Sequence, residues 1–282
     1  MNKITEKRVL TEGVVLMKIY APRIAKKAEP GQFIIVMPSE KSERVPLTVA
    51  DYDRESGDVT IIFQTVGATT MELGEMNVGE EVFAFTGPLG KASHTEGIKR
   101  AAVIGGGLGC AIAYPQAKKL HELGAHVDMI AGFRNKDIII LEKEMEEASS
   151  RLFVMTDDGS NGNKGLVTNK LEELLASGEK YDEVIAIGPL VMMKFVCKLT
   201  EKYGVKTVVS MNPIMIDGTG MCGGCRLTVG GETKFACVDG PDFDGHLVDF
   251  DEMIRRSAMY KKEEACARDA HCNLMKTEEK GE

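Results

Sequence analysis

The N-terminal third of the chain alternates apolar and polar positions with the period of two that is typical of β-strands. Val59, Ile61 and Phe63 fall on one face of such a run. Short strands at this spacing predict a small antiparallel barrel over residues 1–97, closed by a turn at 87–90. Further runs of the same type, separated by Gly and Pro, lie at residues 13–20, 32–37, 47–50 and 81–85.

The pattern changes from residue 100 onward, where apolar strands alternate with segments of helical periodicity. Ala113, Ala117 and Leu120 recur at helical spacing after the first of these strands. Regular alternation of strand and helix predicts a doubly wound parallel sheet over residues 98–211, the architecture of nucleotide-binding domains. The strands are expected at residues 101–104, 127–131, 152–155, 184–187 and 207–209.

A Gly- and Cys-rich stretch follows, so residues 212–250 are expected to form a separate region, with a helical tail at 251–282. The length agrees with this division, because 282 residues suffice for about two domains with cores of their own. The longest nearly apolar run, 101–114, contains four glycines and is too short to cross a bilayer. The N-terminus also lacks the long apolar core of a signal peptide, and a soluble cytoplasmic protein is expected.

The charge balance argues against one class of partner. The chain has 35 Lys and Arg against 43 Asp and Glu, which leaves a net charge of −8. A protein with this balance is not expected to bind nucleic acid or an anionic membrane through a general surface.

The strongest chemical motif is D-x4-C-x2-C, formed by Asp217, Cys222 and Cys225, with Cys237 further along. If Cys replaced the Asp, the spacing would be that of plant-type [2Fe–2S] proteins. A carboxylate is a competent anionic ligand for iron, and the glycines of this loop let the backbone aim N–H groups at inorganic sulfide. We therefore expect these four residues to hold a [2Fe–2S] cluster. A zinc site or inert buried thiols are the alternatives, although the chain has only one C-x2-C.

The other four cysteines lie outside this motif. Cys110 and Cys197 have apolar neighbours in predicted helices and are expected to be buried thiols. Cys266 and Cys272 lie in the charged tail, where a structural role is expected in preference to cluster binding.

Three strand ends of the predicted sheet predict a nucleotide site. The run GGGLG at 105–109 follows a strand and opens a helix, where a pyrophosphate can approach the helix N-terminus. The run GPLVM at 188–192 and the pair Asp157 and Asp158 follow two other strands, at the same edge of the sheet. The two aspartates favour NAD over NADP, although Arg134 could contact a 2′-phosphate. A tight turn without a ligand would show similar glycines.

The predicted barrel carries two shorter motifs. The run RVPLT begins at Arg44, and Gly67 precedes Thr69 and Thr70 at the start of a helix. Glycine and threonine at a helix start offer amides and hydroxyls to a phosphate. A capped short helix after a strand would have the same residues.

These motifs occur in an order that resembles the ferredoxin–NADP reductase superfamily. Within it, the chain is similar to the electron-transfer subunits of dihydroorotate dehydrogenase and of NADH-dependent reduced ferredoxin:NADP oxidoreductase. The resemblance covers residues 5–245, and it implies FAD, NAD(H) and one [2Fe–2S] cluster held by the four residues of the motif above. The FAD contacts that it implies are Arg44, Pro46, Leu47, Thr48, Ile62, Phe63, Gln64, Gly67, Thr69 and Thr70. The NAD(H) contacts that it implies are Gly106, Gly107, Leu108, Gly109, Asp157, Asp158, Gly188, Pro189 and Met192.

The chain departs from the dihydroorotate-type pattern at three places. Asp217 stands where that family has a cysteine, and Arg44 lies one position before the family's arginine. A tail also follows the cluster motif.

The resemblance implies a subunit that exchanges hydride between NAD(H) and FAD and passes single electrons through the cluster. Its partner would be a larger flavin and iron–sulfur subunit in a heterodimer, with ferredoxin and NADP(H) as indirect partners in an electron-bifurcating enzyme. No catalytic side chain is expected, because the cofactors carry the chemistry. One alternative is an electron-transfer subunit of dihydroorotate or another dehydrogenase. A different class of alternative is a non-catalytic, zinc-stabilised nucleotide-binding module that regulates a partner.

Overall fold

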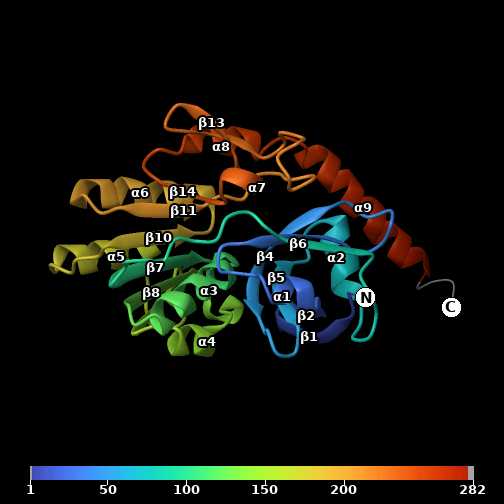
Figure 1. The fold of residues 1–282 in the computed structure, drawn as a ribbon, viewed down its shortest axis with the longest axis horizontal. Coiled ribbons are helices and arrows are strands. Elements are labelled where there is room, and N and C mark those ends of the chain that lie inside the picture. Colours follow the sequence, from blue (N-terminus) through green and yellow to red (C-terminus); the bar gives the residue numbers. More distant parts are fainter. Residues whose placement is uncertain (1, 279–282) are drawn as a thin grey trace.

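The computed structural model describes residues 2–278, with side chains described through residue 270. It contains a barrel-like antiparallel sheet, a mixed sheet flanked by helices, and a third region that packs on the mixed sheet (Figure 1). These are the parts that the sequence predicts, so the expected fold class is confirmed.

The first sheet has six antiparallel strands in the order β1-β2-β5-β4-β3-β6. Backbone pairing between Lys3 and Glu81 joins the start of β1 to the segment before β6, which helps to close the sheet. Its core is apolar, and Met17, Ile61 and Phe63 are almost completely buried. The elements are β1 (Ile4–Thr11), β2 (Val14–Tyr20), α1 (Pro22–Ala25), β3 (Phe33–Met37), β4 (Val45–Tyr52), β5 (Asp58–Gln64), α2 (Ala68–Glu75) and β6 (Ala84–Leu89).

Two expectations for the barrel differ from the structure. The turn predicted at 87–90 is wrong, because β6 continues through Gly87 and Pro88 and pairs Leu89 with Phe33. A proline fits there because β6 is an edge strand, whose outer N–H groups need no partner strand. The strand β1 was not predicted, since most of its side chains are at least partly exposed and show little apolar alternation.

The second sheet has the order β14-β11-β10-β7-β8-β9, in which only β14 is antiparallel to its neighbour. Successive residues of β7 face opposite sides: Val103 packs with α3 and α4, and Ile104 packs with α5 and α6. Helices therefore cover both faces, as a doubly wound sheet requires. The elements are β7 (Arg100–Gly106), α3 (Gly109–Glu122), β8 (His126–Phe133), η1 (Lys136–Ile138), α4 (Glu142–Glu147), β9 (Arg151–Thr156), α5 (Val167–Ala176), β10 (Glu183–Ile187), α6 (Leu190–Tyr203), β11 (Thr207–Ser210) and β14 (Asp242–Asp244).

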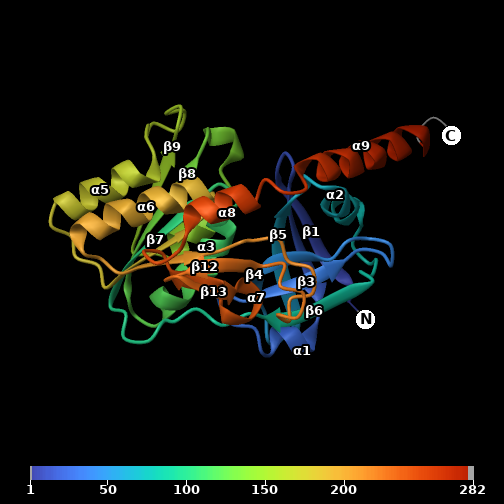
Figure 2. The same cartoon turned by 90° about the horizontal axis from the view of Figure 1, so that it is seen from above.

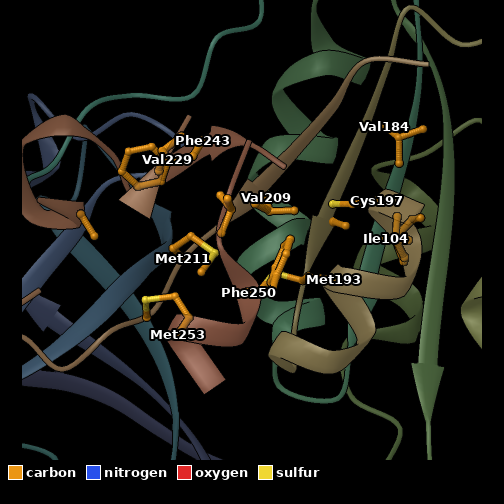
Figure 3. Packing of buried hydrophobic residues seen from close by; sticks show 14 of the residues in the cluster. Ile104, Val184, Met193, Cys197, Val209, Met211, Val229, Phe243, Phe250 and Met253 are labelled. Atoms are coloured by element: carbon orange, nitrogen blue, oxygen red, sulfur yellow. The ribbon is translucent and has the colours of Figure 1, made fainter. Parts of the chain in front are cut away.

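The third region shares its core with the second sheet. Figure 3 shows Val229, Phe250 and Met253 of this region beside Val209 and Met193 of the sheet domain. The strand β14 belongs to this stretch of sequence but forms the edge of the second sheet, so the region is continuous with the domain of that sheet. Its other elements are β12 (Arg226–Val229), β13 (Glu232–Phe235), α7 (Ala236–Asp239), α8 (Phe250–Arg256) and α9 (Lys261–Glu278).

The helix α9 leaves this region and runs outward past α2 of the barrel (Figure 2). It is strongly polar, and the side chains described on it are almost all exposed. Within residues 2–278, no helix combines the length and the apolar character needed to cross a membrane.

Candidate functional site

A cleft of about 1700 Å³ lies between the barrel and the carboxyl ends of the parallel strands. The strand order reverses between β7 and β10, which is the point where open α/β sheets bind their ligands. The structure thus brings the barrel motif that begins at Arg44 and the three predicted strand ends to one cleft. The predicted residues that line the cleft are Pro46, Thr48, Gln64, Gly106, Gly107, Leu108, Gly109, Asp157, Gly188, Pro189 and Met192.

Several lining residues belong to no motif in the sequence. Phe33 comes from β3 of the barrel, and Ser210, Asn212 and Met215 follow or end β11. The position of β11 could have indicated the latter group, because its carboxyl end meets the same sheet edge as β7 and β10. No comparable signal in the sequence places Phe33.

The glycine turn before α3 combines two physical requirements. Gly107 has a φ of +56° and no atom within 4 Å of the position that a Cβ would occupy, so it combines a left-handed conformation with open space. A Cβ on Gly109 would collide with the carbonyl oxygen of Ile187. Close packing therefore explains the glycine at 109. Gly107 leaves the start of α3 accessible from the cleft, where the helix dipole favours an anion.

The two aspartates after β9 occupy different environments. Asp157 lines the cleft together with Arg134. Asp158 is exposed outside the lining, where its carboxylate accepts a hydrogen bond from the Ser160 amide at 2.9 Å. This hydrogen bond is the main cause that lowers the pKa of Asp158. Only Asp157 is therefore placed to influence a ligand in the cleft directly.

The barrel threonines satisfy local hydrogen bonds. The hydroxyl of Thr70 accepts from the amides of Val66 and Gly67 at 3.1 and 3.0 Å, at the start of α2. The hydroxyl of Thr69 accepts from the Glu43 amide at 3.2 Å. The capped-helix interpretation of this motif therefore has direct support, and flavin binding by these residues stays a prediction.

Three more predicted flavin contacts have side chains that pack into the interior. Ile62 and Phe63, on opposite faces of β5, lie in separate apolar clusters. Leu47 is half-buried against the barrel core. Any contact of Ile62 or Phe63 with a ligand in the cleft would have to come mainly from their backbone groups.

Arg44 is directed to the cysteine loop. Its Nε donates to the carbonyl oxygen of Ile216 at 2.8 Å, and its Nη2 donates to that of Asp217 at 3.3 Å. These partners lie more than 170 positions later in the chain. The contact of Arg44 with flavin stays a prediction, because two donor groups of its guanidinium already bind the cysteine loop.

The inner half of the cysteine motif consists of Cys225 and Cys237. Their Sγ atoms are 3.2 Å apart, and both residues are at most 2% exposed. Pairing of Arg226 with Phe235 in the β12–β13 hairpin brings the two cysteines together. Burial, followed by the neighbouring Cys225 thiol, raises the pKa of Cys237.

The outer half of the motif consists of Asp217 and Cys222. The Asp217 carboxylate accepts hydrogen bonds from the amides of Thr219 at 2.7 Å and Cys222 at 2.8 Å. These bonds, that of Thr219 first, lower the pKa of Asp217 and keep it anionic. Cys222 is exposed, and its Sγ accepts from the Gly224 amide at 3.4 Å.

The donor set fits a two-iron cluster better than a single ion. Among the side chains that the structure describes, no three His, Cys, Asp or Glu converge as ligands of one metal. In a [2Fe–2S] cluster each iron is held by only two protein ligands, so the protein must supply two pairs. The inner and outer halves of the motif are such pairs, whereas a zinc site would need four converging ligands.

The remaining cysteines separate into buried and exposed residues. Cys110 and Cys197 are at most 5% exposed, and burial raises the pKa of each to about 12, as expected for inert thiols. Cys266 is exposed on α9, and the structural role expected for it stays a prediction. The side chain of Cys272 lies outside the described residues.

Comparisons with known proteins agree with this arrangement. Residues 212–249 match the iron–sulfur cluster binding domain of dihydroorotate dehydrogenase B, and residues 103–198 match the oxidoreductase NAD-binding domain. The chain is 54% identical to an uncharacterised protein of the adh 3′ region in Clostridium beijerinckii, over 95% of this chain and 93% of that protein. It is 45% identical to a dihydroorotate dehydrogenase B electron transfer subunit homolog of Thermotoga maritima, over 94% and 93% of the two chains.

A solved structure also matches nearly the whole chain. It is that of NADH-dependent reduced ferredoxin–NADP oxidoreductase, studied for flavin-based electron bifurcation. The TM-score is 0.91 at 42% identity, with 96% of this chain and 97% of that chain covered.

Fold and matches together define an oxidoreductase in which an NAD-binding domain is followed by an iron–sulfur region. More narrowly, the chain belongs to the family of dihydroorotate dehydrogenase B electron-transfer subunits and their homologues. The family resemblance expected from the sequence is therefore confirmed.

Proposed function

We propose that this chain exchanges hydride between NAD(H) and a bound FAD, and passes single electrons through a [2Fe–2S] cluster to or from a larger partner subunit. One observation carries the proposal: the strand β3 serves both sites. Phe33 of β3 lines the cleft, and Ile35 of the same strand packs against Gly218 of the cysteine loop. The cleft and the loop are thus neighbours along one strand, at residues two positions apart on the same face.

The cleft residues divide between the two nucleotides according to their domain. Pro46, Thr48 and Gln64 of the barrel would contact FAD, together with the backbone of the other predicted barrel residues. Gly107, at the start of α3, would approach the pyrophosphate of NAD(H), and the predicted residues after β7, β9 and β10 would surround the rest. When bound, FAD accepts two electrons as hydride and releases them singly. The chain's own contribution is to bind and orient both nucleotides in one cleft.

The cysteine loop would hold the cluster through two pairs of ligands. Asp217 and Cys222 would hold one iron, and Cys225 and Cys237 the other. Both inner thiols must lose their protons for this, so assembly of the cluster should release protons. Burial raises the pKa of the Cys237 thiol, so its ionisation would depend on binding of the cluster.

The cleft favours NAD(H) over NADP(H) through Asp157, whose carboxylate would repel a 2′-phosphate. Arg134 in the same lining would oppose this preference. Steady-state kinetics with both nucleotides test the assignment, and a lower Michaelis constant for NADPH than for NADH would contradict it.

The names of the relatives indicate the larger assembly. One relative is named as an electron transfer subunit homolog, and the matching structure is that of a ferredoxin–NADP oxidoreductase. We infer a heterodimer with a larger flavin and iron–sulfur subunit, with ferredoxin and NADP(H) as indirect partners. A cytoplasmic location is also inferred, since thiolate ligands stay reduced there.

A dihydroorotate dehydrogenase complex is the second candidate, because residues 212–249 match the cluster domain of that enzyme. Anaerobic copurification from the native cell separates the two assemblies. The complex is expected to catalyse NADH-dependent reduction of NADP in the presence of reduced ferredoxin. NAD-dependent oxidation of dihydroorotate by the copurified complex would favour the second candidate instead.

A further inference from the structure

The backbone of the cysteine loop is held from outside by arginine side chains. Arg44 of the barrel, half-buried, donates to the carbonyl oxygens of Ile216 at 2.8 Å and Asp217 at 3.3 Å. A guanidinium presents several donors in a rigid plane, so two such bonds fix both position and orientation. The peptide groups on both sides of Asp217 are therefore fastened to the residue that precedes β4.

Two other arginines hold the opposite end of the loop. Arg226 donates to the carbonyl oxygen of Gly223 at 3.2 Å, and Arg256 of α8 donates to that of Gly224 at 3.1 Å. Both belong to the same region as the loop itself. Arg44 differs from them because its bonds cross from the barrel to the cysteine loop.

A second contact fixes the loop to the barrel at the next residue. Gly218 is buried with a φ of +77°, and a Cβ there would lie 2.8 Å from Leu89 Cδ1 and 3.2 Å from Ile35 Cγ1. The loop backbone therefore lies directly on β3 and β6. Ile35 also belongs to the apolar cluster that contains Cys225 and Cys237.

We propose that Arg44 is a positioning residue that fastens the Asp217 side of the cysteine loop to the flavin-binding barrel, and thereby sets the separation between flavin and cluster. The inference rests on the proposed function, since it assigns a purpose to this contact only if both groups are bound. A rigid separation matters because each electron must cross from one group to the other. Without Arg44, the outer pair of ligands would lose the hydrogen bonds that join its loop to the barrel, and only the packing of Gly218 on β3 and β6 would connect the two.

The experiment uses the full chain, purified anaerobically with FAD and iron–sulfur cluster, as wild type, Arg44→Gln, Arg44→Lys and Arg256→Gln. Arg256→Gln is the matched control, because it also removes one guanidinium from a loop carbonyl but leaves the barrel contact intact. Pulsed electron paramagnetic resonance of half-reduced protein measures the dipolar coupling between flavin semiquinone and reduced cluster. Stopped-flow spectroscopy then measures electron exchange between them.

Arg44→Gln is expected to broaden the distribution of separations and to slow electron exchange several-fold. Arg256→Gln should keep the wild-type distribution, and Arg44→Lys, which retains a charged donor, should lie between. A wild-type distribution in Arg44→Gln overturns the inference. So does a variant that loses FAD while its cluster signal is unchanged, because Arg44 would then be a flavin ligand.

If the proposed function itself is wrong, the experiment gives a different result from failure of the Arg44 inference. Wild-type protein would then lack iron, acid-labile sulfide or flavin, and no dipolar coupling would exist to compare. Should Arg44→Gln not fold, Arg44→Lys against Arg256→Gln makes the same comparison, and identical distributions in both would overturn the inference.

Discussion

The two halves of the cysteine motif are built in different ways. Cys225 and Cys237 lie in the apolar core, with their sulfur atoms already in contact. Asp217 and Cys222 lie on a half-exposed loop that is held by backbone hydrogen bonds. Packing of the core therefore brings the inner pair of ligands together. The position of the outer pair depends instead on the geometry of its turn and on the attachment of its loop to the barrel. Substitutions in the two halves should differ accordingly, in stability as well as in metal content.

The largest contrast is expected between Cys225→Ser and Cys222→Ser. Both should lose the cluster, but a hydroxyl at position 225 would be buried among apolar groups. We expect Cys225→Ser to lower the free energy of unfolding of the metal-free protein by about 1–3 kcal/mol, and Cys222→Ser to change it by less than about 0.5 kcal/mol. Iron analysis and urea unfolding check this. Equal unfolding energies would contradict the difference between the two halves.

The attachment of the outer pair is tested by Gly218→Ala against Gly223→Ala. Both glycines have a positive φ, so both changes share a strain of about 1–2 kcal/mol. Only the methyl group at 218 meets the barrel, which should add about 1–3 kcal/mol of overpacking. A Cβ on Gly223 would meet no atom nearer than Phe235 Cε1 at 3.7 Å. The unfolding temperature and the cluster content should therefore both be lower for Gly218→Ala than for Gly223→Ala. Similar values in the two variants would show that the loop does not pack against the barrel.

A subtler change converts the outer pair into an all-cysteine one. Asp217→Cys should lower the reduction potential of the cluster, because a thiolate donates more electron density to iron than a carboxylate does. Spectroelectrochemical titration should show a fall of roughly several tens of millivolts. An unchanged potential would mean that Asp217 is not an iron ligand. Asp217→Asn serves as the control that removes the charge without supplying a thiolate.

The smallest effect concerns the edge strand that attaches the inner half to the sheet. Burial raises the pKa of Asp242 on β14, even though Ser93 and Gln116 donate hydrogen bonds to it. The protonated form is thus favoured in the folded state. Stability from this group is present at low pH, below the ordinary carboxyl pKa, and is lost as the pH rises through the raised value.

Asp242→Asn should therefore raise the free energy of unfolding near neutral pH by roughly 1 kcal/mol, with a smaller gain in acid. The amide could also donate to the Gln116 Oε1 atom, which is buried without a hydrogen-bond partner. Asp244→Asn, at a more exposed site on the same strand, should have little effect at either pH. A stabilisation of Asp242→Asn that does not vary with pH would refute titration as the cause.

Patterns within a short stretch of sequence were sufficient for most of the fold. Short apolar runs predicted the strands β7, β8, β9, β10 and β11, and helical spacing predicted a helix after the first of them. The strand β1 was not predicted because it is mostly polar. The strands β12, β13 and β14 were not predicted because, unlike β11, they are short segments without a continuous apolar run. The place of β14 in the second sheet depends on tertiary pairing with β11.

The candidate site was predictable where chemistry lies in local spacing. The D-x4-C-x2-C motif and the strand-end glycines are of this kind. The contact of Arg44 with Ile216 and Asp217 is not, because it joins residues more than 170 positions apart. A glycine can be required by close packing or can leave space for a ligand, and a single sequence does not distinguish the two. Gly109 is required by packing, whereas Gly107 faces open space.

The central claim is that one chain carries a flavin and a two-iron cluster that NADH can reduce. The most direct test is the visible spectrum of anaerobically purified protein before and after addition of NADH, together with iron and acid-labile sulfide analysis. We predict a flavin band at about 450 nm, roughly two irons and two sulfides per chain, and bleaching by NADH. A colourless protein that contains zinc would contradict the claim and favour a nucleotide-binding regulatory module.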